Sequence, residues 1–308
     1  MVIIFILLLI PSFCFSTYSI VAWDGEEMGV AVQSHWFSVG TVVSWAEAGV
    51  GAVATQSFAN ISYGYVGLEL LKAGFNAEEA LKALLSVDEE REVRQVAIVD
   101  RDGNVSVFTG KNCIKFAGHI KGENFSVQAN LMKNEGVPEA MARAFKNSKG
   151  DLAERMIIAL KAAEDVGGDL RGKQSASIKI VKVKPEGPPF KNVIVDLRVE
   201  DTEEPLKELE RLYKIHKAYS LMDKGDIALS KKDIKNAIKF YSDASKYYEN
   251  DEIIFWKGVS FYLAGEKEEG RKILKQLVEN KSQWKELLIR LVPQGMIKED
   301  DLKFIFSK

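Results

Sequence analysis

The residue with the clearest capacity for chemistry is Thr17, which follows an apolar leader and opens the stretch TYSIVAW (17–23). A threonine hydroxyl is a weak nucleophile until a base takes its proton. A free α-amine on the same residue can act as that base, directly or through a water molecule. An α-amine ordinarily has a pKa of about 7.7–8.0, so part of it is neutral near pH 7. Cleavage immediately before Thr17 would therefore create an N-terminal nucleophile able to attack amides.

Residues 1–16 have the layout of a secretory signal. An unbroken apolar run from Val2 to Ile10 comes first, and the small residues Cys14 and Ser16 stand at positions −3 and −1 relative to Thr17. This layout predicts cleavage between Ser16 and Thr17 and an extracytoplasmic or secreted protein, although cleavage after Cys14 is also sterically feasible. The run is shorter than the roughly 18–20 residues that span a bilayer, so we expect no stable membrane span.

Two further strands carry polar residues with catalytic potential. Ser34 follows a strand expected to form a hairpin with the strand of Thr17, and its hydroxyl could bind the amine or position a water. The alternative is a polar strand end that meets solvent. Gln128 and Asn130 are two apart in a predicted strand and so share one face. The uncharged Asn130 amide suits an oxyanion donor, while Gln128 would bind substrate; structural amides that cap a turn are the alternative.

The densest polar cluster is GDLRGKQS (168–175), which lies between a predicted helix and a predicted strand. Arg171 could donate two hydrogen bonds to a substrate carboxylate, with Asp169 orienting Arg171 or the Thr17 amine. Gln174 is a further candidate substrate-binding residue. The alternative is a helix-to-strand turn that contains only a local ion pair.

Hydrophobic periodicity places strands and pairs of helices in alternating groups. Clustered strands with helix pairs between them favour two sheets sandwiched between two helical layers over a parallel doubly wound sheet. The expected fold class is therefore α+β, a four-layer αββα sandwich. The aromatic residues expected in its core are Trp23, Trp36, Phe37 and Trp45. The predicted strands cover residues 17–23, 29–33, 49–55, 95–99, 105–108, 125–129, 175–184 and 192–199, and the predicted helices cover residues 66–71, 80–85, 137–146 and a stretch that starts at 151 and stops at 167–168.

The composition changes after about residue 200 to a helical pattern with an internal repeat. At a shift of 33, Gly225, Ala237, Tyr241 and Ala244 align with Gly258, Gly270, Leu274 and Leu277. This spacing resembles the tetratricopeptide repeat. The alternative is a plain helical tail packed on the first domain. The predicted domains are a signal peptide (1–16), the αββα domain (17–200) and a helical-repeat domain (201–308).

Ten stretches of the first domain together resemble the domain-of-unknown-function 1028 family, whose cytoplasmic members typically begin Met-Thr-Phe-Ser-Ile. The resemblance implies an N-terminal-nucleophile (Ntn) hydrolase-like fold and puts Thr17 at the matching nucleophile position. It implies no particular substrate. The stretches are TYSIVAWD (17–24), GVAVQSHWFSVG (29–40), AGVGAVATQS (48–57), NISYGYVGLELL (60–71), REVRQVAIVD (91–100), FTG (108–110), AGH (117–119), FSVQANL (125–131), GGDLRGKQSAS (167–177) and VDLRVED (195–201).

Charge and composition narrow the remaining choices. The net charge of −2 gives no reason to expect nucleic acid, and three scattered histidines with no CxxC or HExxH motif suggest neither a metal nor an organic cofactor. We therefore expect an exported N-terminal-threonine amidohydrolase that acts on a small-molecule or peptide amide. The alternative is a non-catalytic binding module on the same scaffold, whose helical tail binds a protein or cell-wall partner. Assembly into a homo-oligomer is left open.

Overall fold

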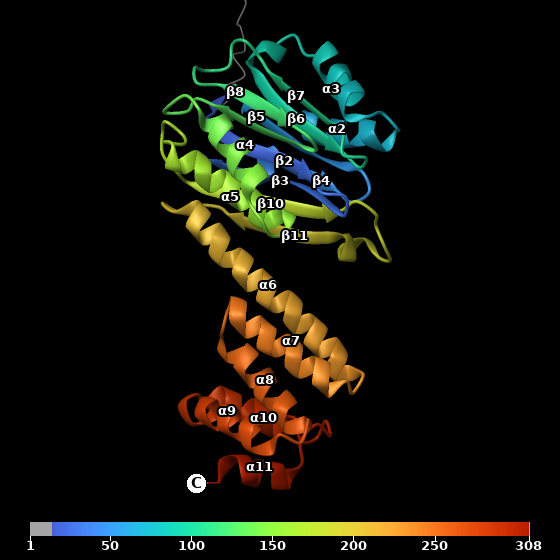
Figure 1. Cartoon of the computed structure of the whole chain (residues 1–308), viewed down its shortest axis with the longest axis vertical. Coiled ribbons are helices and arrows are strands. Elements are labelled where there is room, and N and C mark those ends of the chain that lie inside the picture. Colours follow the sequence, from blue (N-terminus) through green and yellow to red (C-terminus); the bar gives the residue numbers. More distant parts are fainter. Residues whose placement is uncertain (1–13, 308) are drawn as a thin grey trace, which may run out of the picture. The chain divides into compact units, whose positions relative to one another are not determined.

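The computed structural model describes residues 14–307, so the apolar run predicted to belong to a signal lies outside the described residues. The chain divides into two compact units, Met1–Glu210 and Arg211–Lys308. The first unit combines strands and helices, and the second is helical, which confirms the α+β class (Figure 1). Among residues 14–307, no helix combines the length and apolarity needed to cross a membrane.

The central layer of the first unit contains a six-stranded antiparallel sheet in the order β11-β10-β3-β2-β9-β8. Its middle strand β2 begins at Thr17, opposite Ser34 of β3 on one side and Asn130 of β9 on the other. The β-branched and aromatic residues of TYSIVAW favour this strand. The six strands are β2 (Thr17–Trp23), β3 (Glu27–Ser34), β8 (Gly118–Gly122), β9 (Phe125–Asn130), β10 (Ser175–Lys182) and β11 (Val193–Val199).

A second antiparallel sheet stacks on the first and has the order β1-β5-β6-β7, with β4 also paired to β5. The short strands β4 and β8 were not predicted, because four or five residues carry too little alternation to be recognised. The strands of this sheet are β1 (Cys14–Phe15), β4 (Ser44–Glu47), β5 (Gly51–Phe58), β6 (Arg94–Asp100) and β7 (Val105–Thr109).

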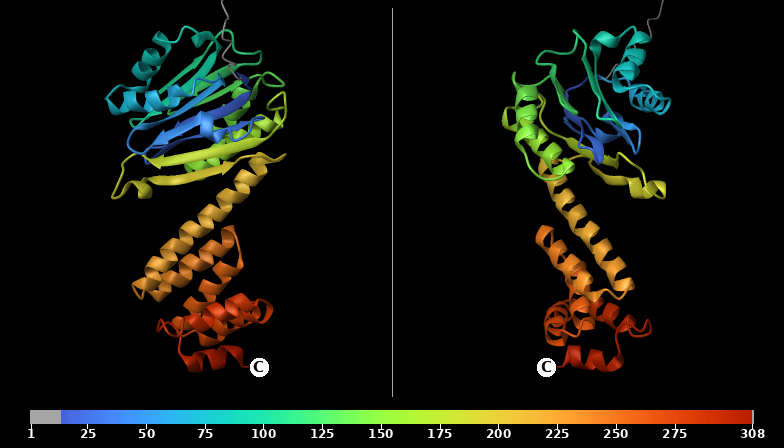
Figure 2. Two further views of the ribbon diagram at one scale, coloured as in Figure 1. Left: turned by 180° about the vertical axis from the view of Figure 1, so that it is seen from behind. Right: turned by 45° about the vertical axis from the view of Figure 1, so that its right-hand side comes forward.

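Two pairs of helices cover the outer faces of the sheets, so the layers follow the predicted order αββα (Figure 2). Helices α2 (Ser62–Lys72) and α3 (Ala77–Ser86) pack on the second sheet, and α4 (Val137–Asn147) and α5 (Leu152–Asp165) pack on the first. Asn76 caps α3 through a reciprocal capping box with Glu79. The short elements α1 (Gly40–Val43), η1 (Arg91–Val93) and η2 (Pro189–Asn192) complete the unit.

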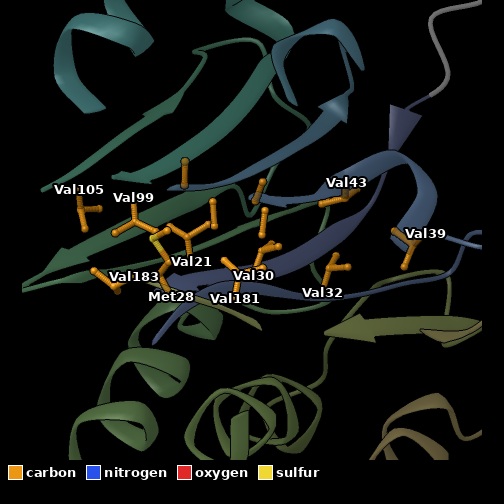
Figure 3. Close-up of a cluster of buried hydrophobic side chains, with 14 residues drawn as sticks. Val21, Met28, Val30, Val32, Val39, Val43, Val99, Val105, Val181 and Val183 are labelled. Atoms are coloured by element: carbon orange, nitrogen blue, oxygen red, sulfur yellow. The ribbon is translucent and has the colours of Figure 1, made fainter. Parts of the chain in front are cut away.

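The layer between the two sheets is apolar over most of its length (Figure 3). Val21, Val30 and Val32 of the first sheet pack there against residues such as Ala54 and Val99 of the second. Each buried valine side chain contributes about 1.5–3 kcal/mol relative to an exposed one. Because strand residues alternate between faces, Thr17 and Ser19 point into the same layer as Val21. The layer therefore changes from apolar to polar towards the start of β2.

The second unit contains the rest of α6 (Pro205–Ser230), which starts in the first unit, and five more helices. Residues related by the 33-residue shift make equivalent contacts. A Cβ atom at Gly225 would lie 2.9 Å from the Tyr241 ring, and one at Gly258 would lie 2.8 Å from the Leu274 side chain. Small residues are thus needed at both positions. The other helices are α7 (Ile234–Tyr247), α8 (Asp251–Leu263), α9 (Lys267–Asn280), α10 (Ser282–Arg290) and α11 (Glu299–Phe306).

The half-buried carboxyl of Glu27, at the start of β3, makes the stability of the first unit depend on pH. Burial, with a smaller contribution from the nearby charge of Asp24, raises its pKa from 4.5 to about 7. In the unfolded chain this group ionises near 4.5, whereas in the folded chain it ionises near 7. The folded state is therefore favoured most at low pH, and this contribution is lost as the pH rises from about 4.5 to about 7.

We predict that Glu27→Gln flattens the change in unfolding free energy between pH 4.5 and 7, because the amide has no proton to lose. Urea unfolding at several pH values measures this change. The exposed Glu89, which is not among the charges that act on Glu27, supplies the control variant Glu89→Gln, which should keep the slope of the parent chain. An unchanged slope in Glu27→Gln would contradict the assignment.

Candidate functional site

Three of the predicted residues meet at the polar end of the layer between the sheets. Thr17 lies at the start of the central strand β2, with Ser34 directly opposite on β3 and Asn130 directly opposite on β9. All three residues are fully buried. The pairing of these strands therefore places a hydroxyl on one side of Thr17 and a carboxamide on the other.

The Thr17 hydroxyl is part of a short chain of hydrogen bonds. Thr17 Oγ1 donates to Ser34 Oγ over 3.1 Å, and Ser34 Oγ donates in turn to the main-chain carbonyl of Ser16. Ser34 thus orients the oxygen that would act as nucleophile and also contacts the peptide bond that precedes it. The nitrogen of Thr17 belongs to that peptide bond, so a free α-amine on Thr17 would require cleavage of this bond.

Arg171 and Asp169 form an ion pair beside the same peptide bond. Arg171 Nη2 donates to the Ser16 carbonyl over 3.0 Å and to Asp169 Oδ2 over 3.1 Å. The Asp169 side chain is fully buried and also accepts hydrogen bonds from the backbone nitrogens of His35 and Arg171, each over 2.8 Å. A carboxylate held by so many donors is fixed in place, so it fixes the guanidinium as well.

Buried carboxamides from both sheets hold the main-chain carbonyl of Thr17. Gln56 Nε2 on β5 donates to this oxygen over 3.2 Å, and Asn130 Nδ2 donates to it over 3.4 Å. Both amides also donate to Gln95 Oε1 on β6, over 2.7 and 3.1 Å. Gln95 Nε2 then donates to the carbonyl of Ala129 over 2.9 Å. Gln95 therefore connects the two sheets directly beneath Thr17.

The same network includes Gln128, which lies deeper between the sheets. Its Nε2 donates to Ser19 Oγ over 2.6 Å, its Oε1 accepts from Ser126 Oγ over 3.1 Å, and Ser19 Oγ donates to Gln56 Oε1 over 2.5 Å. The amide of Gln128 is thus engaged by the protein itself. Gln174, the other predicted substrate-binding amide, donates its side chain to Asp201 over 3.1 Å.

The structure thus brings together Thr17, Ser34, Asn130, Asp169 and Arg171 and directs Gln128 and Gln174 to other partners. Both Asn130 amide hydrogens are used by Gln95 and the Thr17 carbonyl, and only Asn130 Oδ1 lacks a partner. The donors that converge on a carbonyl next to Thr17 Oγ1 are instead Ser34 and Arg171.

Sequence analysis missed Gln56, Gln95 and Ser19 as parts of the site. All three are fully buried and lie among other polar residues at one end of a strand, and this gathering of polar residues is the signal that could have identified them. The prediction that Phe37 lies in the core is wrong, since its side chain is 63% exposed. Leu170, between Asp169 and Arg171 in sequence, is 56% exposed.

Comparison with known proteins identifies the family. The model of a family of unknown function, DUF1028, matches residues 17–209, and the chain belongs to this family. A crystal structure of a DUF1028 protein from Silicibacter pomeroyi is 30% identical, with a TM-score of 0.58, and the match covers 64% of this chain and 84% of that chain. No curated protein matches the sequence. Thr17, the predicted nucleophile, is the first residue of the family match.

A matched pair of glutamines tests the buried network. Gln95 uses both atoms of its amide, whereas fully buried Gln33 on β3 has no partner for either amide atom. Gln95→Met removes the acceptor of one Asn130 amide hydrogen and the donor to the Ala129 carbonyl, and each buried group left unpaired costs about 1–3 kcal/mol. Gln33→Met instead removes polar atoms that are already unsatisfied.

We therefore predict that Gln95→Met lowers the free energy of unfolding by about 1–3 kcal/mol or more. Gln33→Met should leave it unchanged or raise it. Urea denaturation of the two variants beside the parent chain measures both effects. Equal losses in the two variants would show that hydrogen bonding at Gln95 contributes nothing beyond packing.

Proposed function

We propose that the protein is an exported N-terminal-threonine amidohydrolase of the Ntn type, formed by cleavage between Ser16 and Thr17. One observation carries this proposal. A threonine hydroxyl at the start of a central strand lies within a hydrogen bond of Ser34, and the adjacent carbonyl is contacted by Ser34 and Arg171. Cleavage at this peptide bond would place a free amine on the residue that bears the hydroxyl.

The reaction would proceed in two steps. The neutral amine of Thr17 takes the hydroxyl proton, directly or through water, while Thr17 Oγ1 attacks the carbonyl carbon of the substrate amide. The carbon–nitrogen bond of the amide then breaks, the leaving nitrogen receives the proton, and the acyl group remains on Oγ1 as an ester. Water attacks the ester, which releases a carboxylic acid and restores the hydroxyl.

The negative charge on the attacked oxygen needs hydrogen-bond donors that are already in place. Arg171 Nη2 and Ser34 Oγ both donate to one carbonyl oxygen beside Thr17, and Asp169 holds the guanidinium in position. We assign oxyanion stabilisation to this pair. Asn130, which was predicted to supply the donor, would instead position Thr17 by holding its main-chain carbonyl.

Cys113, a free thiol, is an alternative nucleophile. Burial raises the pKa of its thiol, and its Sγ donates to the main-chain carbonyl of Arg94 over 3.3 Å. Because the thiolate is the reactive form, a raised pKa lowers its reactivity near neutral pH. The chemistry is therefore assigned to Thr17.

We predict that the chain beginning at Thr17 forms one covalent adduct with a β-lactone probe, detected by intact mass. Thr17→Ala should form none, because no hydroxyl remains, and Thr17→Ser should react because it keeps both groups. A chain with one methionine before Thr17 keeps the hydroxyl but has an amide in place of the amine. Its labelling rate should be lower than that of the authentic chain by about 100-fold or more, as expected for the loss of a general base.

The control is Cys113→Ala, which should label as fast as the parent chain. If the methionine-extended chain labels as fast as the authentic one, the α-amine plays no part and the mechanism is wrong. If the adduct maps to Cys113, the assigned nucleophile is wrong.

A further inference from the structure

Residues 14–16, which cleavage would remove, occupy a defined place in the fold. Strand β1 (Cys14–Phe15) pairs antiparallel with the end of β5, with Cys14 opposite Phe58 and Phe15 opposite Ser57. Ser16 follows and is fully buried. The segment therefore lies extended along one sheet edge and leads directly to Thr17. Its removal would expose that edge and open a slot where Ser16 lies.

The side-chain hydroxyl and the main-chain carbonyl of Ser16 each have hydrogen-bond partners in this slot. The Ser16 hydroxyl donates to the main-chain carbonyl of Leu131 over 2.8 Å and contacts that of Asn130 at 3.2 Å. Its carbonyl accepts from Ser34 Oγ and from Arg171 Nη2. The slot therefore offers two carbonyl oxygens to the Ser16 hydroxyl, and two donors, Ser34 and Arg171, to the Ser16 carbonyl oxygen.

The backbone that supplies the two acceptors has an unusual conformation. Leu131 has a φ of 54°, in the left-handed region that a leucine rarely adopts. This turn follows β9 directly and brings the consecutive carbonyls of Asn130 and Leu131 to one hydroxyl. Such a conformation costs on the order of 1–3 kcal/mol and persists only where the surrounding structure imposes it, most often at ligand sites.

The position of Ser16 relates directly to the position of a substrate. In the uncut chain, the acyl group of Ser16 is bonded to the nitrogen of Thr17. In an acyl-enzyme, the acyl group of the substrate would instead be bonded to Thr17 Oγ1. Only the Cα and Cβ atoms lie between this oxygen and the nitrogen of Thr17. Ser34 and Arg171 can therefore bind either the carbonyl of Ser16 or the carbonyl of a substrate acyl group. The residue that carries the substrate carbonyl would then lie in the slot that Ser16 occupies.

We propose that the space filled by residues 14–16 is the acyl-side subsite, and that the substrate is a peptidic amide with a serine-like acyl residue. Such a residue is small, because the fully buried slot of Ser16 has no room for a larger side chain. It carries a side-chain hydrogen-bond donor, because the carbonyls of Asn130 and Leu131 both face this position. The residues before it extend along the edge of β5 near Ser57 and Phe58. This assignment rests on the proposed function, and it makes the uncut chain self-blocked.

The test uses the chain beginning at Thr17 and the peptide acetyl-Ala-Phe-Ser with a free carboxylate. This peptide reproduces residues 14–16, with alanine in place of Cys14 to prevent oxidation. Calorimetry measures its binding, and protection against the β-lactone probe shows where it binds. We expect binding and protection with acetyl-Ala-Phe-Ser, at least about 5-fold weaker binding with acetyl-Ala-Phe-Ala, which lacks one hydrogen bond, and none with the bulkier acetyl-Ala-Phe-Val.

Two controls locate the peptide. A chain that retains residues 14–16 before Thr17 should not bind acetyl-Ala-Phe-Ser, because the slot is already filled. Arg171→Met in the processed chain should weaken binding, with circular dichroism showing that the variant folds. Equal binding by the processed and the uncut chains would overturn the subsite.

The outcomes separate this inference from the proposed function. Selective peptide binding without labelling by the probe would support the subsite and contradict the amidohydrolase. Labelling at Thr17 with no protection by any of the three peptides, or with equal protection by all, would support the enzyme and overturn the subsite.

Discussion

The main-chain carbonyl of Thr17 is the acceptor on which the geometry of the site depends. Gln56 and Asn130, from opposite sheets, both donate to it, and both are tied to Gln95. If this carbonyl were displaced, the hydroxyl of Thr17 would lose its alignment with Ser34. Since the backbone of Thr17 is held from both sheets, its side chain and its nitrogen are positioned by the core itself.

This arrangement has a cost that the rest of the sandwich offsets. A fully buried set of amides is favourable only when its members form hydrogen bonds with one another. Apolar residues would fill the same space without the energetic cost of unpaired polar groups. Towards the other end of the layer, valines such as Val21 and Val30 supply conventional hydrophobic stabilisation. The division suggests that the polar end is kept for the position it gives to Thr17 and not for stability.

Local patterns were enough to predict the main elements. The β-branched and aromatic residues of TYSIVAW predicted β2 with the bounds that the structure has, Thr17–Trp23. The short strands β4 and β8 were missed because their few residues depend on long-range partners. Phe37 was misplaced because aromatic character alone does not tell a core residue from an exposed one.

The candidate site could be predicted only in part for a similar reason. Thr17, Ser34 and Asn130 followed from strand ends, and Arg171 with Asp169 from a polar turn. Gln95 contacts groups on β5 and β9, and no local pattern reveals which strands of two different sheets will face each other.

The most direct test of the central claim is the pH dependence of probe labelling at Thr17 in the processed chain. If the α-amine is the base, the labelling rate should rise with a single apparent pKa near that of an α-amine, about 7.7–8.0 before any shift by the site. Titration of the ¹⁵N-labelled amine of Thr17 by NMR should give the same value. A labelling rate that ignores the amine titration, or that rises only above pH 10, would contradict the account.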